Sequence, residues 1–91
     1  MAVNVNAEFE RLIKLHQEIL PGLTGVFHFP SRKNEAYCRM ELKLTVAGKE
    51  ILRRGPINRS LIERDPHYGH LRFVFQFALN ELIAKWGTSN G

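Results

Sequence analysis

Five arginines fall between Arg53 and Arg72, in a stretch that also holds two histidines and no lysine. The planar guanidinium group of arginine presents its N–H donors in a fixed geometry and often binds a phosphate or a carboxylate through two hydrogen bonds. Glycine and proline within the stretch indicate a connection between elements, and loops on a rigid scaffold often carry binding residues. We therefore expect this arginine-rich segment, residues 53–72, to face an anionic partner.

Positive charge is concentrated in the middle of the chain. Residues 32–72 hold ten of the thirteen Lys and Arg residues and five acidic ones, a net charge of +5, whereas the remainder, with three basic and four acidic residues, has a net charge of −1. This asymmetry is typical of a surface that binds nucleic acid or an acidic protein, and a solvated basic surface without a partner is the alternative. The expected anion-binding residues are Arg32, Lys33, Arg39, Lys43, Lys49, Arg53, Arg54, Arg59, Arg64 and Arg72.

Asp65, His67 and His70 resemble a metal-binding set in composition, and His28 lies on a predicted strand from which it could join them. The sequence has no second carboxylate at helical spacing and no known metal motif. We expect the two histidines of residues 65–70 to be polar residues in the first turns of a helix. No metal and no cofactor is predicted.

A single cysteine, Cys38, excludes an intramolecular disulfide and a cysteine-based zinc site. Cys38 falls on the expected buried side of a strand, and His16 falls on the apolar stripe of a helix, so both are predicted to be core residues. No nucleophile elbow, phosphate-binding glycine loop or pair of carboxylates suited to catalysis occurs. We therefore expect no catalytic residue and no enzymatic activity.

The elements that position these residues follow from hydrophobic periodicity. Apolar residues at spacings of three and four predict a helix over 7–20 with Asn6 as its N-cap. Strict alternation predicts a half-buried strand over 37–46. Shorter strands are predicted over 26–30 and 49–53, the second returning from a turn at Ala47-Gly48.

A second helix is predicted from Asp65-Pro66 to Trp86, although residues 71–77 also alternate and leave a strand open for that part. Phe73 and Phe77 widen its apolar side beyond what one small sheet requires. We expect Phe73, Phe77 and Trp86 to form an interface with a partner or with a second copy, as a homodimer through the last helix. The alternative is that Ile57, Leu61 and Ile62 fold over the two phenylalanines.

These elements predict an α+β fold: a helix, a three-stranded antiparallel sheet and a second helix, with both helices on one face of the sheet. The 91 residues allow one domain, expected over 7–87, with a flexible N-terminus at 1–6 and a disordered tail at 88–91. No signal peptide and no apolar run long enough to cross a bilayer is present, so we expect a cytoplasmic protein without membrane contact.

The hairpin Met-Glu-Leu-Lys-Leu-Thr-Val-Ala-Gly-Lys-Glu-Ile at 40–51, together with Ala78, Leu79 and Leu82, resembles the double-stranded-RNA-binding domain. That family also runs helix, three antiparallel strands, helix, so the resemblance covers most of the chain and implies this topology. The family grips phosphates with lysines at the start of its last helix, where this chain has residues 65–70, and the resemblance therefore implies no individual binding residue.

Two functions are compatible with these features. The first is a binding module that engages the backbone of duplex RNA or DNA through its basic surface, largely independently of sequence. The second is a small regulator or inhibitor, of the kind encoded by phages or mobile elements, that binds an acidic patch on a host protein. The expected partner is accordingly nucleic acid or an acidic protein surface.

Overall fold

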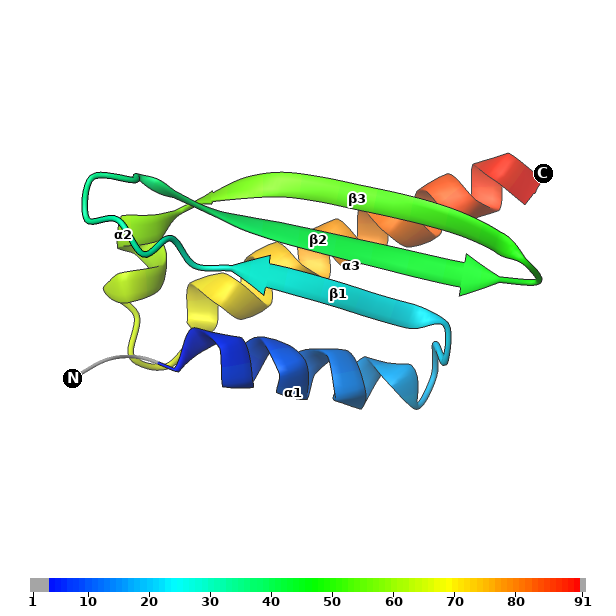
Figure 1. Ribbon diagram of the computed structural model, residues 1–91. Helices are drawn as coiled ribbons and strands as arrows, with labels where there is room; N and C mark the ends of the chain where they lie inside the picture. The colour runs from blue at the N-terminus through cyan, green and yellow to red at the C-terminus, as the bar shows by residue number, and fades with distance from the viewer. Residues whose placement is uncertain (1–3, 91) are drawn as a thin grey trace.

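The computed structural model describes residues 4–90, with side chains described for residues 4–87. The predicted tail, residues 88–91, lies outside the described side chains. The chain forms a helix, a three-stranded antiparallel sheet and two further helices, which confirms the predicted α+β fold. Both long helices cover one face of the sheet and leave the other face open (Figure 1). The elements are α1 Val5–Gln17, β1 Leu23–His28, β2 Tyr37–Val46, β3 Lys49–Asn58, α2 Arg59–Glu63 and α3 Gly69–Asn90.

β2 occupies the centre of the sheet, between β1 and β3. Its bounds match the strand predicted over 37–46, and its alternate side chains are buried beneath the helices, namely Cys38, Met40, Leu42 and Leu44. Ala47 and Gly48 form the predicted hairpin turn, and both have a positive φ, as a two-residue turn that follows the twist of the sheet requires. Alternation predicted this strand correctly because one face is packed and the other is open.

β3 is longer than the sequence predicts. Gly55-Pro56 predicts a break after Arg53, but the strand continues to Asn58. β3 is an edge strand, and an edge tolerates a proline whose missing N–H would otherwise point into solvent. The arginine-rich segment 53–72 is therefore not one continuous loop, because it comprises the second half of β3, α2, a short connection at 64–68 and the start of α3.

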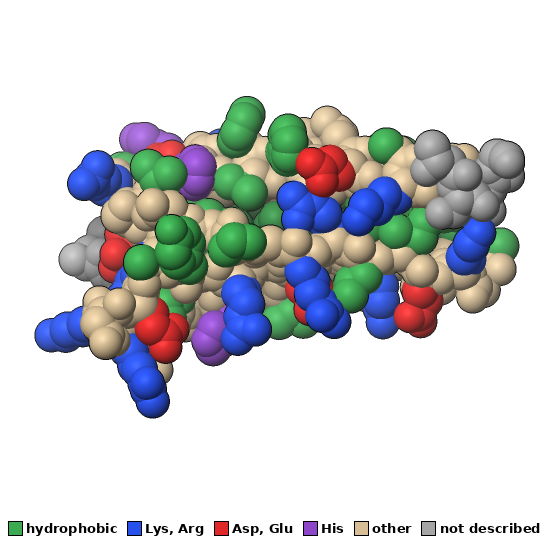
Figure 2. Space-filling model, turned by 90° about the horizontal axis from the view of Figure 1, so that it is seen from above, with side chains coloured by type: hydrophobic (Ala, Val, Ile, Leu, Met, Phe, Trp, Pro, Cys, Tyr) green, Lys and Arg blue, Asp and Glu red, His purple; other side chains and the backbone are tan. Residues whose placement is uncertain are grey.

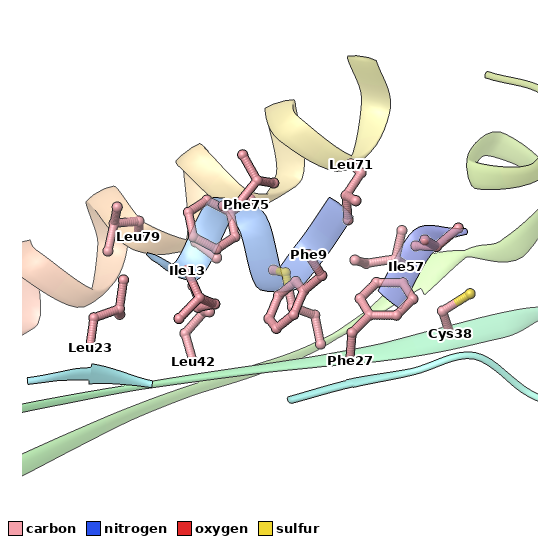
Figure 3. Close-up of a cluster of buried hydrophobic side chains, with 14 of the residues drawn as sticks. Phe9, Ile13, Leu23, Phe27, Cys38, Leu42, Ile57, Leu71, Phe75 and Leu79 are labelled. Atoms are coloured by element: carbon pink, nitrogen blue, oxygen red, sulfur yellow. The ribbon is translucent and has the colours of Figure 1, made fainter. Parts of the chain in front are cut away.

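The core lies between the sheet and the two long helices (Figure 3). Phe9 of α1 contacts Phe27 of β1 and Phe75 of α3, with ring centroids 5.6 and 5.9 Å apart. Leu42, in the middle of β2, has no exposed surface. The short α2 adds Ile62 to the same core and so closes one end of the molecule.

α1 begins two residues earlier and ends three residues earlier than the predicted helix. Its N-cap is Asn4 rather than Asn6, and the Asn4 Oδ1 accepts a hydrogen bond of 3.1 Å from the N–H of Ala7. The earlier start places Val5 in the core. Of the expected flexible N-terminus, residues 1–6, the first three lie outside the described residues.

α3 begins later than predicted. The sequence predicts a start at Asp65-Pro66, whereas α3 starts at Gly69, because Tyr68 has a φ of 59° that interrupts the helical geometry. Residues 71–77 are helical, so the alternative interpretation of a strand is wrong. Within residues 4–90, no helix is both long and apolar enough to cross a membrane.

Candidate binding surfaces

The ten predicted anion-binding residues do not form one patch. Three of them, Arg39, Lys43 and Arg54, lie on the open face of the sheet, and two, Arg32 and Lys33, lie on the loop between β1 and β2. Lys49 begins β3. The other four lie on or against the helices: Arg53, Arg59, Arg64 and Arg72. Figure 2 shows Lys and Arg side chains spread along the β3 side of the molecule with acidic side chains among them.

Arg53 lies on the helix-covered face of the sheet, because its register partner in β2 is the buried Leu42. Its Nε is 2.7 Å from Oε2 of Glu81 on α3, and its Nη1 donates to the backbone carbonyl of Arg54. Only 26% of the Arg53 side chain is exposed. This arginine therefore joins β3 to α3 and is occupied within the fold.

Arg59 holds the loop between β1 and β2 against α2. Its Nη1 donates to the carbonyl oxygen of Arg32 at 2.6 Å, and its Nε lies 3.4 Å from Oε1 of Glu63. The guanidinium also lies over the ring of Phe29, 4.9 Å from the ring centroid, which adds a cation–π contact. With 17% of its side chain exposed, Arg59 presents little surface to a partner.

Arg72 connects α3 to α1. Its Nε lies 3.4 Å from Oε2 of Glu8, and its Nη2 donates to the carbonyl oxygen of His67 at 2.7 Å. Glu8 is 11% exposed at its side chain and also binds Arg11. The hydrogen bond from Arg11, followed by the contacts with Arg72, lowers the pKa of Glu8 against the opposing effect of its burial. Arg72 therefore ties α3 to α1, with 51% of its side chain still exposed.

The open face of the sheet presents three rows of side chains across its strands. They are His28, Arg39 and Pro56; Val26, Glu41 and Arg54; and Thr24, Lys43 and Leu52. Glu41 stands between Arg39 and Lys43 on β2, where its charge would repel a phosphate, but its Oε2 is 3.0 Å from Nε of Arg54 in the same row. Arg39 and Lys43 have no acidic partner within 4 Å among residues 4–87.

Arg32 and Lys33 continue this set of unpaired cations on the neighbouring loop. The loop joins His28 to Tyr37, the two strand ends next to Arg39, and neither of its cations has an acidic partner among the described residues. A hollow of about 640 Å³ beside it is lined by two acids as well as two cations, so it is no dedicated anion site: Lys33, Glu35, Ala36, Asn58, Arg59, Ser60 and Glu63. We call Arg32, Lys33, Arg39 and Lys43 the 32–43 cations.

His28 lies on the open face beside Arg39 but was not among the predicted binding residues. The strand β1 begins at Leu23, and the alternation from Leu23 onward places His28 on the exposed side. The predicted strand begins only at Val26, so it is too short to show this alternation. Arg64 is also without an acidic partner in the described part of the chain, but it follows α2 and lies apart from the open face.

The residues considered for catalysis or metal binding make the following contacts within the fold. The backbone N–H groups of His67 and His70 donate to the two carboxylate oxygens of Asp65, at 3.0 and 2.9 Å. Burial raises the pKa of Cys38 to about 11, so its thiol stays protonated at neutral pH. Nδ1 of His16 lies 2.8 Å from the carbonyl oxygen of Leu12. Among the described residues, no group of three or more His, Cys, Asp and Glu side chains could hold a metal ion.

Phe73 and Phe77 are the exposed aromatic residues of α3, with 68% and 53% of their surface accessible. Their rings stack with centroids 6.5 Å apart. The segment 56–64 does not fold over them, because Ile57 and Ile62 are buried in the core instead. The phenylalanine pair is therefore an unpartnered apolar surface.

Trp86 lies on the core side of α3, away from the phenylalanine pair. It lines an apolar hollow of about 470 Å³ together with Ile19 and Ile83. Its buried indole N–H has no acceptor among the described residues. The predicted interface of three residues thus divides between two places on the helix.

The chain is a small α+β domain whose sheet has one helix-covered face and one open face. No protein-family model, curated protein or solved structure matches it. Its function therefore has to be inferred from its own residues and geometry.

Proposed function

We propose that the chain is a nucleic-acid-binding module that holds the phosphate backbone through the 32–43 cations. The observation that supports this function is the division of the basic residues. Arg53, Arg59 and Arg72 are occupied by contacts within the fold, whereas the 32–43 cations have no acidic partner among residues 4–87. These four also follow one another along β2 and the loop that leads into it, so they can contact successive phosphates.

The open face supplies more than charge. The Glu41–Arg54 pair removes most of the repulsion that an isolated carboxylate would exert on a phosphate. Tyr37 is 59% exposed at the start of β2, where its ring can pack on a ribose of a duplex or stack on an unpaired base of a single strand. Because most of these contacts would go to phosphate and sugar, the module would bind with little sequence preference.

Duplex RNA is the nucleic acid that the topology favours. Apart from the short α2, the order of helix, three strands and helix resembles the double-stranded-RNA-binding domain, and the two long helices cover the same face of the sheet. In that family the last helix starts with lysines, whereas this chain has Asp65, whose carboxylate is occupied by backbone N–H groups. We therefore assign the phosphate contacts to the sheet and its loop rather than to the start of α3.

Fluorescence titration with labelled duplex RNA, duplex DNA and single strands at two salt concentrations tests this function. Each duplex phosphate contact contributes a slope of about 0.9 in log–log salt dependence, so four contacts predict about a 150-fold loss of affinity between about 50 and 200 mM salt. Arg39→Glu is the informative variant. Lys14→Glu is the matched control, because Lys14 is an exposed cation on α1, on the other side of the sheet.

We expect Arg39→Glu to weaken binding at least tenfold. We also expect it to reduce the slope of log affinity against log salt concentration by about 0.9, the contribution of one phosphate contact. Lys14→Glu changes the net charge equally and is expected to weaken binding much less. Equal effects of the two variants would show that only net charge matters, and no binding at low salt to any of the nucleic acids would refute the function.

A second candidate function is binding to an acidic patch on another protein. It is favoured by apolar side chains on the same open face, since Val26 is 63% exposed and Leu52 is 36% exposed. Mixed apolar, arginine and tyrosine surface is common in protein interfaces. One stoichiometric acidic partner that survives nuclease treatment and is lost with Arg39→Glu, together with no affinity for nucleic acid, would support this candidate.

A further inference from the structure

The geometry points to a second copy of the chain as the partner of the β3 edge, joined to it by antiparallel pairing of the two β3 strands about a two-fold axis at Leu52. β3 is ten residues long and has β2 on one side only. A free edge of this length presents unpaired main-chain groups to which another strand can bind. The pairing uses main-chain groups of β3 rather than the side chains of the 32–43 cations, which lie on β2 and the loop before it, and it does not depend on the proposed nucleic-acid contact.

The hairpin determines which main-chain groups of β3 are free. A two-residue turn makes Val46 and Lys49 a hydrogen-bonded pair, and such pairs alternate along an antiparallel ladder. The N–H and C=O groups of Glu50, Leu52 and Arg54 therefore point away from β2. Of these, the Arg54 carbonyl already accepts a hydrogen bond from Nη1 of Arg53, so the partner's N–H would be its second donor. Pro56, which has no N–H, also falls on this outward side, as expected for an edge.

Charge and proline together select one register. With the two-fold axis at Leu52, Glu50 lies opposite the partner's Arg54 and Leu52 lies opposite its own copy. This arrangement forms about six main-chain hydrogen bonds and two opposite-charge pairs on the open face. A shift of the axis toward the turn removes the charge pairs, and shifts toward Asn58 place Pro56 opposite Glu50 or Arg54 opposite its own copy.

The exposed phenylalanines lie beside the same edge. Phe77 and Pro56 line one small cavity between α3 and β3, and Phe73 stacks on Phe77. Figure 2, which looks onto the β3 side, shows hydrophobic side chains exposed along its upper border. In the two-fold pair the two copies of α3 lie on the same side of one continuous sheet, so each phenylalanine pair faces the second copy. This contact supplies apolar burial that strand pairing alone lacks.

Disulfide trapping at the two-fold axis tests the register. Two Leu52→Cys residues would lie at a Cα separation of about 5.5 Å, within disulfide range. Thr24→Cys is the matched control, because Thr24 lies in the same row of the open face but on the opposite edge of the sheet. The native Cys38 is fully buried and does not compete. Mild oxidation is expected to give covalent dimers of Leu52→Cys and mostly monomers of Thr24→Cys.

Analytical ultracentrifugation of the full chain, up to millimolar concentration, tests the association itself. Glu50→Arg converts both charge pairs to like-charge pairs and is expected to raise the dimer dissociation constant about 30-fold. Adding Arg54→Glu restores the opposite charges between the copies and is expected to recover part of the affinity, because it also places a carboxylate opposite Glu41 of the same copy. A chain that stays monomeric at all concentrations overturns the inference. So does a dimer that is insensitive to Glu50→Arg, or one whose Leu52→Cys variant cross-links no better than the control.

Discussion

Replacing Arg53 with glutamine separates the arginines that hold the fold from those available to a partner. The Arg53 Nε lies 2.7 Å from Glu81, and the two side chains are 26% and 41% exposed. Ion pairs at the surface contribute at most about 1 kcal/mol, and breaking a buried pair costs about 3–5 kcal/mol. This pair is partly solvent-screened, so we assign it about 1 kcal/mol. For a domain of this size, that loss lowers the Tm by about 4–8 °C.

Thermal and urea denaturation measure the effect. The cycle of Arg53→Gln, Glu81→Gln and the double variant isolates the interaction, and we expect a coupling energy of about 1 kcal/mol that declines at high salt. Arg39→Gln is the control, because Arg39 lies on the open face and has no carboxylate within 4 Å among the described residues, and its effect on stability is expected to lie within about 0.5 kcal/mol. The reasoning is refuted if Arg39→Gln destabilises the chain as much as Arg53→Gln, or if the cycle shows no coupling.

Two further predictions concern titratable groups. The backbone N–H groups of His70 and then His67 lower the pKa of Asp65, so its contribution to stability is present above its unfolded value of about 4 and is lost as the pH falls through the folded value. Asp65→Asn should therefore destabilise the chain at neutral pH, and the gap to the wild type should narrow in acid; a gap independent of pH contradicts this. The Cys38 thiol, buried and with a pKa of about 11, should not react with a thiol reagent in native protein at mildly alkaline pH but should react in urea. Rapid native reaction would show that the thiol is accessible.

Most of the fold could be predicted from local pattern. The strand over 37–46 was predicted with its bounds because alternating residues separate a packed face from an open one. The end of β3 could not be predicted, because Gly55-Pro56 would end a central strand but is tolerated within an edge strand. Only the order of the strands in the sheet shows that β3 is at an edge. The short α2 was missed because five residues give no helical period to detect.

The pairing of charges could not be predicted at all. Glu41 and Arg54 are thirteen positions apart in sequence and meet only because the β2–β3 register places them opposite each other. Arg53 and Glu81 meet because α3 packs over β3, a tertiary contact that no spacing rule encodes. Composition therefore located the basic half of the chain but not which of its cations remain unpaired.

Most arginines of the segment 53–72 hold parts of the fold together. Of its five arginines, Arg53, Arg54, Arg59 and Arg72 each have a carboxylate within 4 Å. Three of those four also donate to a backbone carbonyl, which a multi-donor guanidinium can do while it holds a carboxylate and a single lysine nitrogen does less well. The preference for arginine over lysine here is thus explained by the need to tie an edge strand, a short helix and a loop together. The phosphate-binding role that we propose is for this reason assigned to the exposed cations of β2 and of the loop before it, which make no such ion pairs among the described residues.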